Sequence, residues 1–179
     1  MRKFMVIALL SFSTASAQGG MLDISLAGWE SWGEWHDAGN SSGHFVLPAG
    51  STIDSIEYID LEFEAIFPSY HSELILSVND TYGAIDFWDS FIPGTLDDSG
   101  DYGPVSGSFE NPGVFGSGPF TLSSGDLYVE VYEDYDDAGQ DAEIRSGTLR
   151  VHYSTVPEPC SVTLAGLGAL ALIRRRFAV

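Results

Sequence analysis

Apolar and polar side chains alternate along several short stretches in the middle of the chain. The clearest case covers residues 60–67, where every second residue is apolar: Leu61, Phe63, Ala65 and Phe67. The same period of two recurs over residues 73–78, 127–132 and 149–154. Successive side chains of a strand point to opposite faces, so each stretch predicts a β-strand with one buried face.

Weaker alternation predicts additional strands over residues 44–47, 53–59, 84–88, 105–109 and 119–122. No segment within residues 18–156 keeps the 3.6-residue period of a helix over a helical length. We therefore expect an all-β domain over residues 18–155, built as an antiparallel β-sandwich or jelly roll. Residues 93–119 contain seven glycines and four prolines, and we expect a long loop there.

The first 17 residues have the parts of a secretory signal peptide in the order used for export. Two basic residues come first, an apolar stretch follows over residues 4–12, and Ala15-Ser16-Ala17 forms an A-x-A cleavage site before Gln18. A buried N-terminal helix is the alternative, but it does not account for this order. We expect residues 1–17 to be removed by cleavage at Ala15, Ala17 and Gln18.

The last 24 residues have the composition of a segment directed to a membrane. Residues 160–173 carry no charge, and three consecutive arginines follow them. A helix of this length spans about 21 Å, which is short for a hydrocarbon core of about 30 Å. It can insert where the bilayer thins and the arginines reach the cytoplasmic interface. We expect a short C-terminal transmembrane helix, and a packed core helix is the alternative.

The order of parts in this tail resembles the PEP-CTERM sorting signal of exported proteins from Gram-negative bacteria that make extracellular polysaccharide. A proline-containing triplet, an apolar stretch rich in small residues and an arginine cluster carry the resemblance, with the motif at Val156, Pro157, Glu158, Pro159, Arg174, Arg175 and Arg176. The resemblance implies recognition by an exosortase, a membrane enzyme that cuts near the triplet. It also implies an inner-membrane intermediate, followed by the cell surface or the extracellular matrix. A glycosylphosphatidylinositol signal shares only the apolar tail.

The second half of the central region is similar to the P-domain-like jelly rolls attached to secreted proteases. The similarity rests on four segments, residues 72–76, 116–122, 132–134 and 146–149. In such domains the last pieces form a strand, an acidic loop and a final strand. The similarity implies the same sandwich that the alternation predicts.

Charge narrows the choice of partners for the central region. Residues 18–156 contain 25 carboxylates against two basic side chains, Arg145 and Arg150, which gives a formal charge of −23. Such a surface repels phosphate groups, so we expect neither a nucleic-acid partner nor docking on anionic lipid. Aromatic residues make up 13% of the chain, enough for a core, and the single cysteine excludes an internal disulfide.

The sequence contains no recognisable catalytic constellation. The histidines are scattered and none stands in an H-E-x-x-H segment, and the serines lie mostly in glycine- and serine-rich turns rather than in the nucleophile elbow of a hydrolase. A pair of acids of the glycosidase type arises easily by chance among so many carboxylates. We therefore expect no enzymatic activity, and a secreted hydrolase of unknown type is the alternative.

The densest acidic segment covers residues 133–141 and suits a hard cation. Calcium prefers several carboxylate and carbonyl oxygens on a flexible turn. The segment begins like an EF-hand loop, but Arg145 stands where the bidentate glutamate belongs. We expect a different calcium site, ligated by Asp134, Asp136, Asp137 and Asp141 and completed by Asp97, Asp98 or Asp101. A solvated charged turn is the alternative.

Three tryptophans recur at every third position near the start of the central region: Trp29, Trp32 and Trp35. Exposed indole faces beside polar groups can stack on the rings of a sugar ligand. In a regular strand Trp29 and Trp35 would point to one face and Trp32 to the other. The pattern indicates either a glycan-binding surface or, because tryptophan is usually buried, packing at the edge of the core.

These features together predict an exported, non-enzymatic β-sandwich protein of the cell surface or of an extracellular polysaccharide matrix. It would act as a structural or binding module, stabilised by calcium and in contact with glycan. Its partners would be an exosortase-type enzyme, the polysaccharide and, before processing, the membrane. A surface protein that keeps its tail as a permanent membrane anchor is a further alternative.

Overall fold

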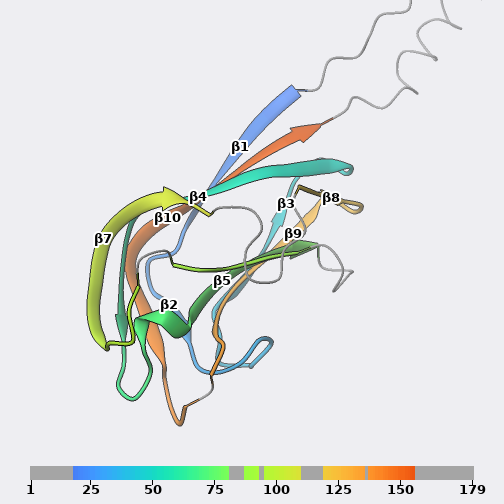
Figure 1. Ribbon diagram of the computed structural model, residues 1–179. Coiled ribbons are helices and arrows are strands. Elements are labelled where there is room, and N and C mark those ends of the chain that lie inside the picture. Colours follow the sequence, from blue (N-terminus) through green and yellow to red (C-terminus); the bar gives the residue numbers. More distant parts are fainter. Residues whose placement is uncertain (1–17, 81–86, 93–94, 110–118, 136, 156–179) are drawn as a thin grey trace, which may run out of the picture. The chain divides into compact units, whose positions relative to one another are not determined.

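The structure is a computed structural model that describes residues 18–80, 87–92, 95–109, 119–135 and 137–155. These residues contain ten β-strands and a short 3-10 helix (Figure 1). The strands are β1 (Gln18–Ser25), β2 (Trp29–Ser31), β3 (Ser42–Val46), β4 (Ser51–Ala65), β5 (Leu74–Asp80), β6 (Phe87–Phe91), β7 (Gly100–Ser108), β8 (Phe120–Leu122), β9 (Asp126–Glu133) and β10 (Ala142–Thr155). The 3-10 helix η1 (His71–Glu73) lies directly before β5.

The strands form two antiparallel sheets. The first has the order β1-β10-β4-β7, with β2 also paired to β10 and β8 to β4, and the second has the order β3-β9-β5-β6. The pairs are nested along the chain, since β1 pairs with β10, β3 with β9, β4 with β7 and β5 with β6. The predicted all-β class with antiparallel sheets is therefore confirmed.

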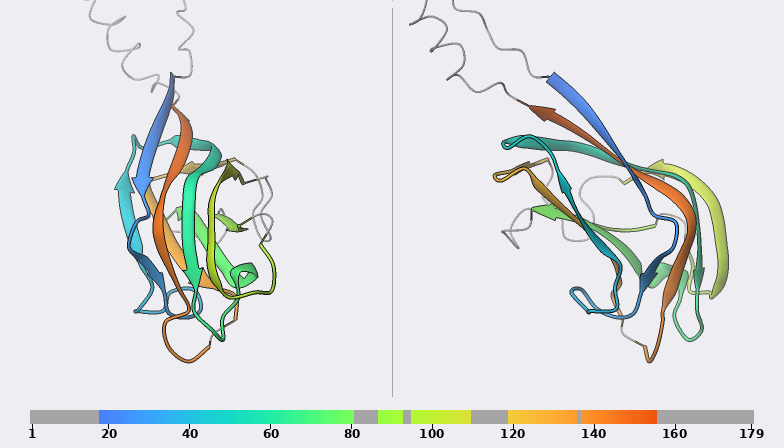
Figure 2. Two further views of the ribbon diagram at one scale, coloured as in Figure 1. Left: turned by 90° about the vertical axis from the view of Figure 1, so that its left-hand side faces the viewer. Right: turned by 180° about the vertical axis from the view of Figure 1, so that it is seen from behind.

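The two sheets face each other and enclose one hydrophobic core (Figure 2). Strand β9 shows how the alternation builds it, because Leu127, Val129 and Val131 are fully buried on its inner face. Strand β4 contributes Leu61 and Phe63 from the opposite sheet. Burial of each such side chain contributes about 1.5–3 kcal/mol, which makes this core the main stabilising element of a domain without disulfides.

Strand β4 is longer than the sequence pattern predicts. It joins the two stretches predicted at residues 53–59 and 60–67 into one strand of 15 residues, which ends at Ala65. The prediction of a buried Phe67 is wrong, because this side chain is 77% exposed. The chain turns immediately after the strand, where the Ser69 N–H donates to the Ile66 carbonyl at 3.0 Å. Phe67 therefore lies in a turn, and the alternation no longer determines its face.

The long loop predicted over residues 93–119 is in part a strand. Strand β7 lies within this range and pairs with β4 at the edge of the first sheet. An edge strand tolerates glycine and proline better than a central strand does. Gly107 lies against the ring of Tyr58, and a side chain at Gly103 would collide with the carbonyl of Leu61. Here the glycines permit close strand contact rather than a loop.

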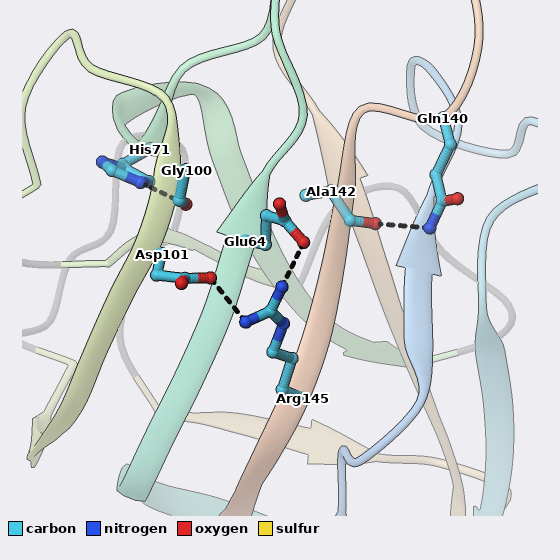
Figure 3. A network of polar contacts seen from close by, with 7 residues as sticks. All are labelled: Glu64, His71, Gly100, Asp101, Gln140, Ala142 and Arg145. Atoms are coloured by element: carbon cyan, nitrogen blue, oxygen red, sulfur yellow. Dashed lines mark hydrogen bonds and ion pairs between the residues drawn. The ribbon is translucent and has the colours of Figure 1, made fainter.

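The outer surface of the first sheet carries an ion-pair bridge across three neighbouring strands (Figure 3). Arg145 of β10 contacts Glu64 of β4 and, at 2.6 Å, Asp101 of β7. A second arginine, Arg150, forms a two-pronged pair with Asp23 of β1 at 2.7 and 2.8 Å. Both arginines of the described residues are thus engaged with carboxylates on the surface of the first sheet.

Candidate functional site

The three tryptophans lie at different depths. Trp29 begins β2 and packs against the hydrophobic core, whereas Trp32 and Trp35 follow that strand and are each 40% exposed. Strand β2 ends at Ser31, so the regular alternation of a strand does not extend to Trp35. The structure therefore separates Trp29, which has a packing role, from the two tryptophans that reach the surface.

A buried carboxylate holds the segment that carries the exposed tryptophans. Glu130 of β9 is 1% exposed, and its Oε1 accepts hydrogen bonds from the His36 N–H at 2.8 Å and from Asn40 Nδ2 at 3.0 Å. Asn40 in turn donates to the Glu34 carbonyl and accepts from the Trp32 N–H at 2.8 Å. Segment 32–40 is therefore fastened to β9 at several points by hydrogen bonds within the protein.

Four aromatic rings form a continuous row beside this segment, which we call the aromatic surface: Trp35, His36, Tyr128 and His44. Trp35 stacks on His36 with ring centroids 3.9 Å apart. His36 meets the edge of Tyr128 at 5.8 Å, and Tyr128 meets His44 at 5.1 Å. The rings come from segment 32–40, from β9 and from β3, so the row crosses from the segment onto the second sheet.

Carboxylates accompany the aromatic surface. The Tyr128 hydroxyl donates to Glu130 Oε2 at 2.6 Å, and His44 Nδ1 lies 3.1 Å from Asp126 Oδ2. Trp32 Nε1 donates to Glu30 Oε2 at 3.0 Å. Burial, together with the bond to Glu130, raises the pKa of Tyr128 to about 12, so the phenol stays protonated and keeps donating at neutral pH. The surface thus combines ring faces with hydrogen-bonding oxygens.

The predicted calcium ligands are only partly brought together. Asp137 is half-buried and Asp141 is 1% exposed, and the Ser69 hydroxyl lies 3.5 Å from Asp137 Oδ2 and 3.1 Å from Asp141 Oδ1. Asp134 is exposed, and Asp136 lies outside the described residues. Within the described part of the chain, no group of three or more His, Cys, Asp or Glu side chains is arranged to hold a metal ion.

The second acidic segment does not complete that set. Asp101 is paired with Arg145, Asp97 accepts a hydrogen bond from the Ser72 hydroxyl at 2.6 Å, and Asp98 caps the following Ser99 N–H at 2.9 Å. The Asp98 carbonyl accepts from the His71 N–H at 2.9 Å, which ties this segment to η1. These three carboxylates therefore contact neighbouring side chains and backbone rather than the predicted calcium ligands.

One buried carboxylate escaped the sequence-based prediction. Glu133 is the last residue of β9 and is 0% exposed. Burial, together with the nearby carboxylates of Asp141, Glu73 and Asp137, raises its pKa to about 8. The Ser69 hydroxyl lowers the pKa in part, although its well-aligned acceptor is Asp141. The signal was present in the sequence, because Glu133 continues the inward series of Leu127, Val129 and Val131.

The predicted segments at the two ends lie outside the described residues. This applies to the signal-peptide positions Ala15 and Ala17, to the triplet at residues 157–159 and to the arginines at residues 174–176. Gln18, the residue after the expected cleavage site, is the first residue of β1. Of the helices in the described ranges, none has the length and apolar character needed to cross a membrane.

Comparison with known proteins gives no family for this chain. No protein family matches the sequence, and no curated protein matches it. Two similar solved structures are the infectious bursal disease virus VP2 subviral particle and the Gx strain of the same virus, each with 12% sequence identity. Their TM-scores are 0.34 and 0.27, over 86% and 90% of this chain. The matches span 37% and 51% of the viral chains, and scores this low do not define a shared fold.

Proposed function

We propose that this protein is an exported, non-enzymatic jelly-roll module of a bacterial cell surface or extracellular polysaccharide matrix, and that it contacts glycan through the aromatic surface and Trp32. An N-terminal signal peptide would export it. A C-terminal transmembrane segment of PEP-CTERM type would hold it at the inner membrane of a Gram-negative cell until an exosortase-type enzyme processes it. The nested strand pairing supports the jelly roll, since two Greek keys produce such nesting.

The observation that carries the glycan contact is the exposed, fixed position of Trp32 and Trp35. A ligand that stacks on them does not have to order the segment, because Glu130 and Asn40 already hold it. Affinity rises when the cost of ordering a binding surface is removed. The carboxylates at Glu30 and Asp126 supply acceptors for sugar hydroxyls beside the rings.

The non-enzymatic part of the proposal is supported by the position of Glu133. A catalytic acid needs a pKa near the working pH and access to substrate. Among the described carboxyl groups Glu133 has a pKa in that range, but it is fully buried between the sheets. A substrate would have to enter the core to reach it.

Polysaccharide binding tests the proposed contact. We expect the chain to be retarded in affinity electrophoresis by the matrix polysaccharide of its own cells, and Trp35→Ala to weaken this affinity roughly tenfold or more. Phe67→Ala is the matched control, because it removes another exposed aromatic ring that lies in a turn after β4. Equal loss in both variants, or no retardation of the unaltered chain, would contradict the proposal.

The sorting part is tested by the intact mass of the protein from its native cells, measured separately in the medium and the membrane fraction. We expect a released species that begins at Gln18 and ends near Pro157. A membrane species that retains residues 174–179 and no released species would mean that the tail is a permanent anchor.

A further inference from the structure

Glu133 faces the interior of the sandwich. It pairs with Leu74 of β5, a core residue, and follows Leu127, Val129 and Val131 on the inner face of β9. Its backbone N–H donates to the Gly33 carbonyl at 3.1 Å, which fixes the residue at the end of the strand. Both of its carboxylate oxygens are buried and have no donor in hydrogen-bonding geometry among the described residues.

The charged groups that act on Glu133 within the described part of the chain are carboxylates. Asp141 is buried beside it, and the Ser69 hydroxyl donates to Asp141 Oδ1 at 3.1 Å. Glu73 and Asp137 also lie close enough to act on Glu133 electrostatically. The arginines of the described residues are occupied elsewhere, Arg145 by Glu64 and Asp101 and Arg150 by Asp23.

A buried carboxylate in this position has to be neutralised. Removing a charge from water costs several kcal/mol unless a partner compensates it. A proton would neutralise Glu133 but would leave its oxygens without partners. A hard cation would neutralise the charge and also fill the coordination of both oxygens, because calcium accepts bidentate carboxylates together with hydroxyl, carbonyl and water oxygens.

We infer that a calcium ion binds between the sheets at this end of the sandwich, held by the carboxylates of Glu133 and Asp141 with the Ser69 hydroxyl beside them. Asp137 lies at the edge of this inner site, 3.5 Å from the Ser69 hydroxyl, and the Asp141 N–H donates to the Ser31 carbonyl at 2.9 Å, which fixes Asp141 beside β2. The site shares Asp137 and Asp141 with the calcium ligands predicted from the sequence, but it uses the buried Glu133 in place of the exposed Asp134. Two carboxylates give modest affinity, in the range of about 10⁻⁴–10⁻³ M typical of extracellular modules.

This inference goes beyond the glycan contact and uses other residues, although it draws its millimolar calcium from the exported location in the proposed function. The test measures the melting temperature of the full chain after removal of metal with a chelator, at pH 7.5 and constant ionic strength. We expect calcium at 10 mM to raise it by roughly 5 °C, with half of this rise reached near about 1–2 mM, because stabilisation by a ligand grows with the logarithm of its concentration above the dissociation constant. Magnesium should have a smaller effect, since it is reluctant to lose its water.

Variants separate the inner site from general charge effects. Glu133→Gln and Asp141→Asn should each abolish the calcium-dependent shift, whereas Asp134→Asn removes an exposed carboxylate next in sequence and should retain it. Terbium luminescence, excited through the aromatic side chains, should report binding in the unaltered chain and in Asp134→Asn only. No calcium shift, a shift that survives in Glu133→Gln, or a Glu133→Gln variant that is more stable than the unaltered chain in saturating calcium would overturn the inference. Polysaccharide binding is measured in the same samples, so that a failure of the proposed function is distinguished from a failure of the calcium inference.

Discussion

Two glutamates three positions apart on β9 illustrate how one strand handles buried charge in two ways. Glu130 points away from the core, yet it is 1% exposed because segment 32–40 covers it. Three donors reach its two oxygens, from His36, Asn40 and Tyr128. Glu133 points into the core, and no donor among the described residues lies in hydrogen-bonding geometry with its oxygens. The hydrogen bonds of Glu130 hold the segment beside the aromatic surface, whereas Glu133 is the carboxylate at which we inferred a calcium ion.

Removal of the Tyr128 hydroxyl tests the role of Glu130. Tyr128→Phe keeps the ring in the aromatic surface but removes the donor that lies 2.6 Å from Glu130 Oε2. We expect a loss of about 1.5–3 kcal/mol in the free energy of unfolding, because a buried carboxylate loses one of its hydrogen bonds. Urea denaturation at pH 7 measures this loss. An unchanged midpoint would mean that water replaces the hydroxyl without cost.

Tyr128 also predicts how stability changes in alkali. Its pKa is raised to about 12 in the folded chain, against about 10 in an unfolded chain. The stabilisation is therefore complete below pH 10 and is lost as the pH rises from about 10 to about 12. Absorbance at 295 nm should show a tyrosine that titrates late and is missing in Tyr128→Phe. Tyr58, whose pKa burial also raises, should titrate late in both proteins.

At the scale of elements, the sequence pattern predicts the central strands better than the edges. Alternating residues identify β5, β9 and both halves of β4, because these strands have one face in the core. In β1, which begins Gln18-Gly19-Gly20 at the edge of its sheet, the alternation is confined to the short run Leu22-Asp23-Ile24-Ser25, and β2 has only three residues. An edge strand pairs with a neighbour on one side only, so its sequence is less constrained and predicts the strand less clearly.

The candidate sites were harder to predict than the strands. The spacing of the tryptophans was visible, but the depth of each depends on where β2 ends and on how Glu130 holds segment 32–40. Those contacts join residues about 90 positions apart, for which no local pattern exists. The contribution of Tyr128 and His44 to the aromatic surface could not be predicted for the same reason, because β3 and β9 are brought together only in the folded sheet.

Strand β10 depends on a glycine at its bend. Gly147 has φ +132°, lies where the pairing with β4 shifts register, and accepts a hydrogen bond from the Leu26 N–H at 3.0 Å. A Cβ at this position would lie 2.9 Å from Leu61 Cα. We expect Gly147→Ala to lower the free energy of unfolding by about 3 kcal/mol or more, from backbone strain and overpacking together.

Gly139→Ala is the matched control for this prediction. Gly139 also has a positive φ, at +118°, but nothing lies within 4 Å of the position that a Cβ would occupy. Its substitution should cost only the backbone strain, roughly 1–2 kcal/mol. Urea denaturation of both variants separates the two contributions, and equal losses would show that the contact with Leu61 relaxes without cost.

At the scale of the whole molecule, charge opposes the fold that the core stabilises. Residues 18–156 carry a formal charge of −23, and their arginines are both committed to ion pairs on the first sheet. Repulsion among so many carboxylates destabilises a compact state. A cation bound within the sandwich would neutralise buried carboxylates, whereas dissolved salt screens only the carboxylates at the surface.

Salt should therefore stabilise this protein in the absence of calcium. Raising NaCl from 0.01 to 0.15 M shortens the screening length from about 30 to about 8 Å, which weakens repulsion between distant carboxylates. We expect the melting temperature with chelator present to rise over this interval. The rise should be larger in Arg145→Gln, because that variant leaves Glu64 and Asp101 facing each other across neighbouring strands without the cation between them (Figure 3). A melting temperature that falls with salt would mean that the two arginine ion pairs outweigh the repulsion of the remaining carboxylates.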